Sequence, residues 1–227
     1  MAARDILGYG ILLAVAALSR LALEAFDFDF VSAAQEMFWS WRYFAVFVAC
    51  YALAAVAAHG AQLPSPPDTL ARWRTRLLQP VAIGILVALL TVVSDVIDPV
   101  AKARGVATIH VAGGAAAAFY AYGAVLLTTV FHFLPIALFA WLATRAPAGA
   151  RAMVVSLGIA IAAFSEDAGY FARAPVFDME WARHALSVAA NGTEALFIYR
   201  YGLLAGIAQR ASTYLVWHIF WPSWDVG

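Results

Sequence analysis

The chain has 227 residues, of which 64% are hydrophobic and only 12% are charged, and its mean hydropathy is +0.80. Soluble domains carry about twice that fraction of charged residues, so the composition excludes a water-soluble globular fold. The 14 basic and 14 acidic residues give zero formal charge, which excludes nucleic acid as a partner because phosphate binding needs a basic excess.

Long apolar runs predict an all-α protein, a single polytopic membrane domain over residues 1–227 with about six transmembrane helices. The predicted spans are residues 6–26, 38–58, 80–100, 116–142, 152–172 and 193–210. Residues 173–192 are expected to form a short helix on the membrane surface. Residues 211–227 are expected to be an aromatic interfacial segment, unless the last helix continues to Trp221. Too few residues follow Arg210 for a seventh span, which needs about 20.

Arginine residues predict the orientation of the bundle. The second and third spans are joined by a segment with Arg72, Arg74 and Arg76, and Arg145 and Arg151 flank the next short loop of this kind. The positive-inside rule assigns both segments to the cytoplasm, and with six spans both termini are cytoplasmic as well. Abundant alanine and a single lysine are typical of GC-rich bacterial genomes, so the expected location is a bacterial inner membrane.

Three acidic residues lie within or at the ends of predicted spans, where a carboxylate is costly unless it is paired or hydrated. Asp95 follows Pro80 by fifteen residues, and Glu166 follows Arg151 by the same number, with Asp167 beside it. At 1.5 Å per residue each acid is roughly 22 Å along its helix. The sequence therefore predicts that these carboxylates lie at a similar depth, toward the outer face.

Two arginine residues are the predicted counter-charges for these acids. Arg20 lies at a comparable depth in the first span, where Glu24 is one helical turn away, and Arg200 lies near the start of the sixth span. Grouped with Asp95, Glu166 and Asp167, they would form a polar cluster that binds a proton, a cation or a small solute. The alternative is a set of structural ion pairs near helix ends that are already in contact with water.

His132 lies in the middle of the fourth predicted span, beside Thr128 and shortly before Pro135. A buried imidazole there predicts one of three roles: a proton relay, a haem ligand or a hydrogen-bonded packing residue. Haem between helices needs a second axial ligand at the same depth, and the other candidates lie near predicted membrane edges. These are His59, His184 and His218. No cofactor is therefore predicted.

A glutamate, a pair of glycines and a single cysteine are three further features of the sequence. Glu194 is expected near the membrane surface, at the start of the sixth span. Gly202 and Gly206 form a small-xxx-small face that suits close helix packing within the protein or across a dimer. Cys50 is the only cysteine, which excludes an intrachain disulfide and a multi-cysteine metal site.

The leading functional hypothesis is movement of a proton, an ion or a small solute through the charged cluster. Phosphate-binding, metalloprotease and serine-hydrolase motifs are absent from the sequence, so no catalytic residue or metal site is predicted. One alternative is a non-catalytic subunit of a membrane complex that binds partner helices, lipid or pigment. Another is a lipid-modifying enzyme that holds a metal with Asp27, Asp29 and Asp98. Expected partners are membrane lipid and other transmembrane subunits or a second copy of the chain.

Overall fold

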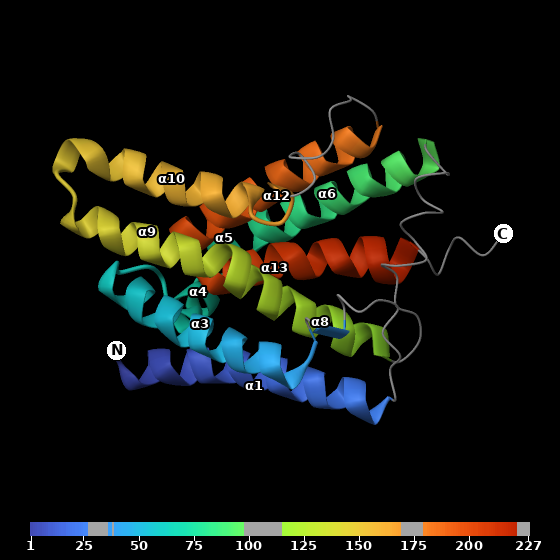
Figure 1. Cartoon of the computed structure of the whole chain (residues 1–227), viewed down its shortest axis with the longest axis horizontal. Helices are drawn as coiled ribbons and strands as arrows, with labels where there is room; N and C mark the ends of the chain where they lie inside the picture. The colour runs from blue at the N-terminus through green and yellow to red at the C-terminus, as the bar shows by residue number, and fades with distance from the viewer. Residues whose placement is uncertain (27–35, 38, 98–114, 169–178, 222–227) are drawn as a thin grey trace.

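The computed structural model describes residues 1–26, 36–37, 39–97, 115–168 and 179–221. All regular secondary structure in these ranges is helical, which confirms the predicted all-α class (Figure 1). The helices are α1 (Ala3–Ala25), α3 (Trp41–Gly60), α4 (Pro66–Ala71), α5 (Trp73–Arg76), α6 (Leu78–Ile97), α8 (Ala115–Leu127), α9 (Leu134–Arg145), α10 (Arg151–Phe164), α12 (Met179–Tyr201) and α13 (Leu203–Tyr214). Shorter turns are the π-helical η1 (Thr128–Phe133) and η3 (Leu215–Phe220) and the 3-10 turn η2 (Ala148–Ala150).

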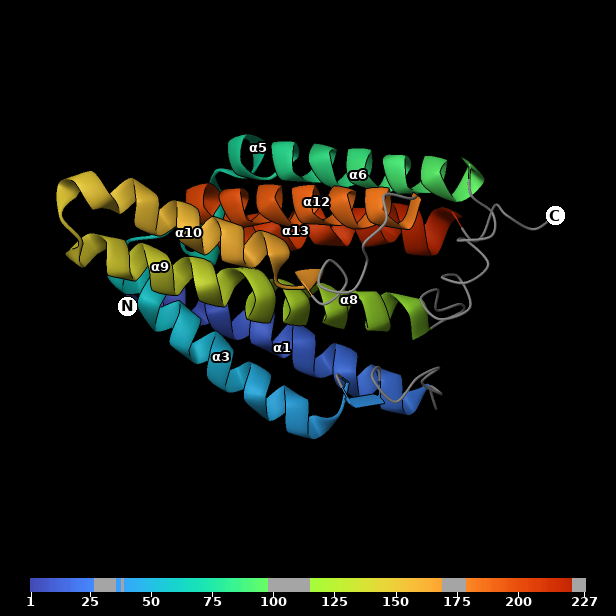
Figure 2. The ribbon, with the colours of Figure 1, turned by 45° about the horizontal axis from the view of Figure 1, so that its top comes forward.

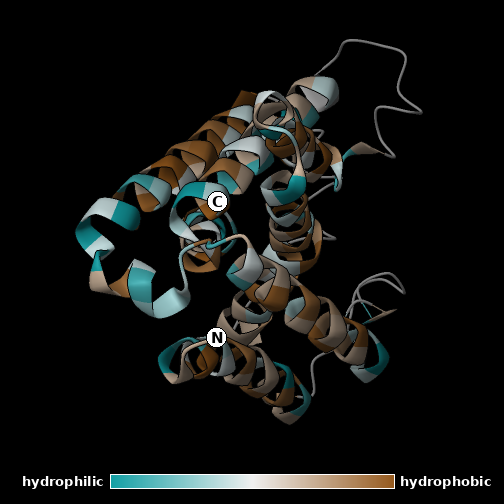
Figure 3. Cartoon of the chain, turned by 90° about the vertical axis from the view of Figure 1, so that its left-hand side faces the viewer, coloured by the Kyte–Doolittle hydropathy of each residue, from teal (hydrophilic) through white to brown (hydrophobic). Residues whose placement is uncertain are grey.

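Four helical segments in the described part of the chain are long and apolar enough to cross a membrane. They are Ala3–Ala25, Trp41–Gly60, Trp73–Ile97 and Ala115–Arg145. Their outer faces carry exposed apolar side chains, including Leu18 on α1, Val56 on α3 and Val96 on α6. Brown, hydrophobic colour covers long stretches of the helices in Figure 3, and teal, hydrophilic residues lie mainly near helix ends. This pattern suits contact with lipid tails along the helices and with water at their ends.

The segment from Met179 onward differs from the predicted surface helix and sixth span. α12 is one continuous helix of 23 residues that ends at Tyr201, and α13 starts at Leu203. Between them Gly202 has φ +89°, a conformation that favours glycine, and a Cβ there would lie 2.2 Å from the carbonyl oxygen of Pro64. Residues 193–210 therefore belong to two antiparallel helices. The hydropathy pattern concealed this hairpin because α12 contains many polar residues.

The ends of the last helix and of α10 can also be compared with the predicted ones. Residues 211–220 continue the helical rod of α13 and η3, which agrees with the alternative of a last helix that continues toward Trp221. α10 ends at Phe164, and residues 165–167 form a turn where a span to residue 172 was predicted. This turn places Glu166 against α13 and Asp167 against α12.

The α12–α13 hairpin lies in the middle of the bundle. α6 packs on one side of it, α8, α9 and α10 pack on the other, and α1 and α3 contact α8 and α9 further out (Figure 2). α6 and α13 approach closely at Gly84, where a Cβ would lie 2.2 Å from the carbonyl oxygen of Gln209. The hairpin therefore packs between other helices on two sides, while residues such as Tyr199 and Arg200 keep part of α12 exposed.

One end of the bundle gathers the arginine-rich connections. The start of α1, the α3–α6 connection and the α9–α10 connection lie toward the left in Figure 1. The tip of the hairpin packs at this end, where the Thr69 hydroxyl donates a hydrogen bond to the Tyr201 carbonyl oxygen. α1 begins at this end, and η3 ends at the opposite end (Figure 1). The start of α1 and the end of η3 therefore lie at opposite ends of the bundle. An even number of spans, such as six, would place them at the same end.

Candidate functional site

A proline in the long α8–α9 rod creates one wall of the site. Pro135 has no N–H to bond the carbonyl of Phe131, and the rod widens into the π-helical turn η1 just before it. The Ser165 hydroxyl, in the turn after α10, lies 3.3 Å from the Phe131 carbonyl oxygen and 2.8 Å from that of Ala162. This contact holds the end of α10 against η1, beside His132.

Arg210 of α13 is the central residue of the site, and it is only 6% exposed. Its Nη2 and Nη1 atoms lie 2.6 and 3.2 Å from the two carboxylate oxygens of Glu166. Its Nε lies 3.1 and 3.3 Å from the carboxylate oxygens of Glu194 on α12. One guanidinium therefore bridges a carboxylate from the turn after α10 and another from α12, in the forked geometry that favours arginine over lysine.

His132 completes this group, and its side chain is fully buried. Its Nδ1 lies 3.3 Å from Arg210 Nη2, 3.6 Å from Glu194 Oε1 and 3.7 Å from Glu166 Oε1. The Thr128 hydroxyl, one turn earlier in the rod, donates a hydrogen bond of 2.7 Å to Glu194. We call His132, Glu166, Glu194 and Arg210 the central cluster. With a neutral imidazole its two carboxylates and one guanidinium carry a net charge of −1.

Polar contacts continue from the central cluster along α12. The Asn191 side-chain oxygen accepts from Arg210 Nη2 at 3.3 Å, and its amide nitrogen lies 3.4 Å from Asp167. Asp167 also accepts from Ser187 at 2.8 Å and lies 2.6 Å from Nδ1 of His184. Since Asp167 is 6% exposed, these contacts supply the partners that a buried carboxylate requires.

A separate ion pair lies further along α12. Asp95 of α6 is 3.0 Å from Arg183 and accepts a hydrogen bond of 2.9 Å from the Trp217 indole. Arg183 also donates to the Ser94 hydroxyl and carbonyl, each at 3.1 Å. Arg183 precedes Asn191 by eight residues, which is about 12 Å along a helix. Asp95 and Glu166 are therefore each paired with arginine, but at different depths.

The predicted site residues thus separate into four groups, one of which is Asp95 with its own partner Arg183. Glu166, Asp167 and His132 come together as parts of one network. Arg20 is paired with Glu24 at 3.1 Å on its own helix, as their spacing suggested, and does not join the acids. Arg200 is exposed on α12. Arg210 pairs with Glu166 in its place, as the counter-charge that was predicted to be Arg200. The expected counter-charges are corrected accordingly, because the turn at Gly202 directs Arg210 back toward Glu194.

Sequence reasoning missed Glu194 and Arg210, although two signals were available. Each is eight residues from Gly202, so a turn at that glycine would place them opposite one another. In addition, His184, Ser187, Asn191 and Glu194 are spaced by three, four and three residues, which places them on one face of a helix. A polar face of this kind is expected on an enclosed helix as well as on a surface helix.

The alternative hypotheses concern a metal site in a lipid-modifying enzyme and haem ligation by histidine. No group of three or more His, Cys, Asp or Glu side chains in the described ranges is placed to hold a metal ion. Asp27, Asp29 and Asp98, the predicted ligands of a lipid-modifying enzyme, lie outside the described residues. The Nδ1 of His132 lies next to Arg210, His184 contacts Asp167, and His218 stacks on Tyr120 at 4.7 Å.

No protein-family model matches the chain, and no curated protein or solved structure shows significant similarity to it. Its class is therefore defined by its own architecture. In the ranges that the structure describes, the protein is helical, with four helices that could cross a membrane and with a buried network of charged residues around an internal hairpin.

Proposed function

We propose that this protein is a multi-pass membrane protein that moves a proton, alone or coupled to an ion or a small solute. The observation that carries this proposal is the arrangement of two carboxylates and a fully buried imidazole around one guanidinium. Ionisable side chains within a membrane bundle are costly and commonly mark proton or ion pathways. The central cluster is the site at which the proton binds.

The charge of the central cluster supports proton binding. Arg210 compensates one carboxylate, so the group keeps one negative charge when His132 is neutral. An uncompensated charge away from water costs several kcal/mol. Uptake of one proton by a carboxylate or by the imidazole removes that charge while the arginine contacts remain, so the cluster alternates between two charge states.

Differences in exposure indicate a route for the proton. The Glu166 side chain is 25% exposed, whereas those of Glu194 and His132 are 3% and 0% exposed. Glu166 is the group that exchanges protons with water, and His132 lies close to both glutamates. Asn191, Asp167 and His184 extend the polar path along α12 in the direction of Arg183.

Proton movement can be measured with the purified protein in liposomes that contain a pH-sensitive dye, with a potassium diffusion potential as the driving force. Glu194→Gln and His132→Asn are expected to reduce the rate of proton entry at least tenfold. The matched control is Glu24→Gln, which neutralises a glutamate paired with Arg20 outside the cluster and should leave the rate unchanged.

Far-UV circular dichroism and thermal unfolding of each variant establish that loss of flux is not loss of folding. Two results would reject the proposal: proton entry no faster than in protein-free liposomes, or equal rates for the wild type and both cluster variants. Adding candidate ions and solutes on one side of the membrane then tests whether proton entry is coupled to a second species.

A topology and a location follow as parts of this proposal. The helical rods α10, α12 and α13–η3 join the four apolar segments to make seven passes, in place of the six expected from hydropathy. The arginine-rich end faces the cytoplasm, so the start of α1 is cytoplasmic and the end of η3 is on the opposite face. A bacterial inner membrane remains the proposed location.

A further inference from the structure

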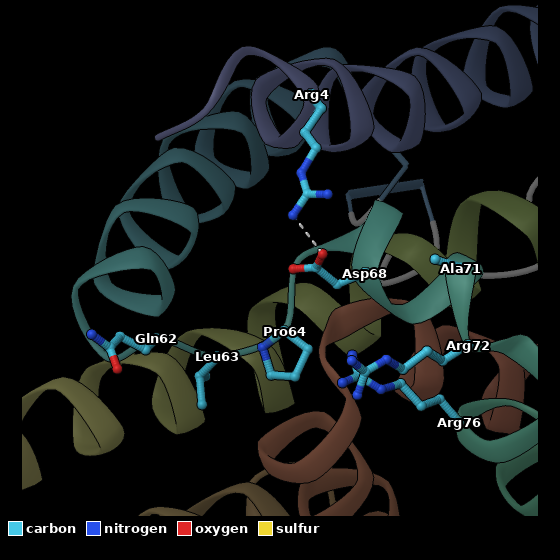
Figure 4. Close-up of a pocket in the computed structure, with 8 residues that line it drawn as sticks. All are labelled: Arg4, Gln62, Leu63, Pro64, Asp68, Ala71, Arg72 and Arg76. Atoms are coloured by element: carbon cyan, nitrogen blue, oxygen red, sulfur yellow. Dashed lines mark hydrogen bonds and ion pairs between the residues drawn. The ribbon is translucent and has the colours of Figure 1, made fainter.

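A cavity of about 550 Å³ lies at the arginine-rich end of the bundle, away from the central cluster (Figure 4). The connection after α3 and the short helices α4 and α5 form most of its wall, and the first turn of α1 contributes one side chain. The lining residues are Arg4, Gln62, Leu63, Pro64, Asp68, Ala71, Arg72 and Arg76. Three of the eight are arginine, and one is acidic.

Asp68 neutralises one of these arginines. It lies 2.8 Å from Arg4, and its other carboxylate oxygen accepts a hydrogen bond of 2.9 Å from the Ser65 hydroxyl. The hydrogen bond from Ser65 and the positive charge of Arg4 hold the pKa of Asp68 below its ordinary value, so this carboxylate is ionised at neutral pH. Arg4 and Asp68 therefore form a closed pair at the edge of the cavity.

Arg72 and Arg76 supply the remaining positive charge. Both side chains extend toward the same part of the cavity in Figure 4. Arg76 Nη1 is buried and has no hydrogen-bond partner in the part of the chain that the structure describes. A buried guanidinium N–H without an acceptor is unfavourable, and a bound anion would supply that acceptor. The cavity thus combines excess positive charge with a donor that needs an acceptor.

Phosphate matches these features better than a carboxylate does. Guanidinium groups bind phosphate oxygens in a forked arrangement, and two arginines one helical turn apart can share one tetrahedral anion. The cavity volume lies within the range of small-molecule sites and admits a phosphate together with the group that bears it. We propose that this cavity binds a phosphate group, carried by an anionic lipid headgroup or by a small soluble phosphate.

Isothermal titration calorimetry of the full chain in an uncharged detergent tests this proposal. The two probes are a short-chain phosphatidic acid and inorganic phosphate, and each is titrated at low salt. Arg72→Gln and Arg76→Gln are each expected to weaken binding at least tenfold, because each removes charge-assisted hydrogen bonds. Arg76→Lys keeps the charge but loses the fork, and it should weaken binding less than Arg76→Gln does.

Arg74→Gln is the matched control, since Arg74 lies on the same short helix. Its guanidinium lies 5.4 Å from the Trp73 ring centroid, and it does not line the cavity. This variant should change the affinity less than twofold.

The relative affinities of the two probes identify the source of the phosphate. Much tighter binding of phosphatidic acid indicates a lipid headgroup, and similar affinities indicate the phosphate group alone. Either result supports the site. The proposal is overturned if neither probe binds saturably, or if Arg74→Gln weakens binding as much as Arg72→Gln and Arg76→Gln. Proton flux through the central cluster does not enter these measurements, so the two proposals can fail separately.

Discussion

Helices α6 and α12 contact each other, yet they differ in what they bury. α6 exposes Leu86, Leu89 and Val93 and, apart from Asp95 near its end, buries apolar or small residues such as Gly84 and Ala88. α12 instead buries Asn191 and Glu194 and directs Ser187 and His184 to Asp167. A hydropathy profile detects a spanning helix whose outer face contacts lipid. It does not detect a helix whose polar side chains form hydrogen bonds and ion pairs with neighbouring helices.

The largest expected effect comes from the residue that links α12 to its neighbours. Arg210→Met leaves the carboxylates of Glu166 and Glu194 without their buried counter-charge, which should lower the free energy of unfolding by about 3–5 kcal/mol. Arg200→Met removes an exposed arginine from α12 and should change it by less than about 0.5 kcal/mol. Unfolding in mixed detergent micelles, followed by circular dichroism, measures both.

Similar losses of unfolding free energy for Arg210→Met and Arg200→Met would contradict the distinction between a buried arginine and an exposed one. The same result would also remove the reason for placing Arg210 at the centre of the site.

A change at the hairpin turn should have the next largest effect. Gly202→Ala places a side chain at φ +89° and against the Pro64 carbonyl, which should cost about 2–3 kcal/mol of unfolding free energy. Gly10→Ala on α1, where a Cβ would meet nothing within 4 Å, should instead stabilise the protein by about 0.5–1 kcal/mol. The same unfolding assay compares them. A tolerated alanine at position 202 would mean that α12 and α13 are not joined by this turn.

The Asp95–Arg183 pair tests whether the contact between α6 and α12 is independent of the central cluster. Asp95→Asn loses the ion pair but keeps an acceptor for Trp217, so the expected loss is about 1–2 kcal/mol. Combined with Arg210→Met, the two losses should add to within about 0.5 kcal/mol, because the sites share no partner. A coupling well above that value would show that one continuous network joins them.

Asp68 at the cavity provides the smallest effect and a pH dependence. Its pKa is lowered in the folded protein, mainly by the Ser65 hydroxyl, so its contribution is present at neutral pH and lost as the pH falls through the lowered pKa. The side chain is 39% exposed, and solvent screening limits this contribution to below about 1 kcal/mol. The stability difference between the wild type and Asp68→Asn should therefore shrink between pH 7 and pH 3. A constant difference would exclude ionisation of Asp68 as its cause.

Particular residues show how far the candidate site could be predicted. Glu166, Asp167 and His132 were identifiable because an ionisable residue in an apolar run is conspicuous. The Arg20–Glu24 pair followed from i, i+4 spacing within one helix. The partner of Glu166 did not follow, because Arg200 and Arg210 are equally plausible until the turn at Gly202 is known. Gly206 packs within the chain, where a Cβ would lie 2.6 Å from Ile198, so its small size serves the hairpin.

The sequence by itself determined the helical class, the apolar segments that could cross a membrane and the presence of costly charges within the bundle. These properties follow from composition and from the length of apolar runs, which are local. Only the tertiary structure decided which charges meet, that α12 packs between α6 and α10, and that Arg210 joins Glu166 to Glu194. Such pairings depend on helices that are distant in sequence, and a buried polar helix acquires its stability from partners that its own residues do not reveal.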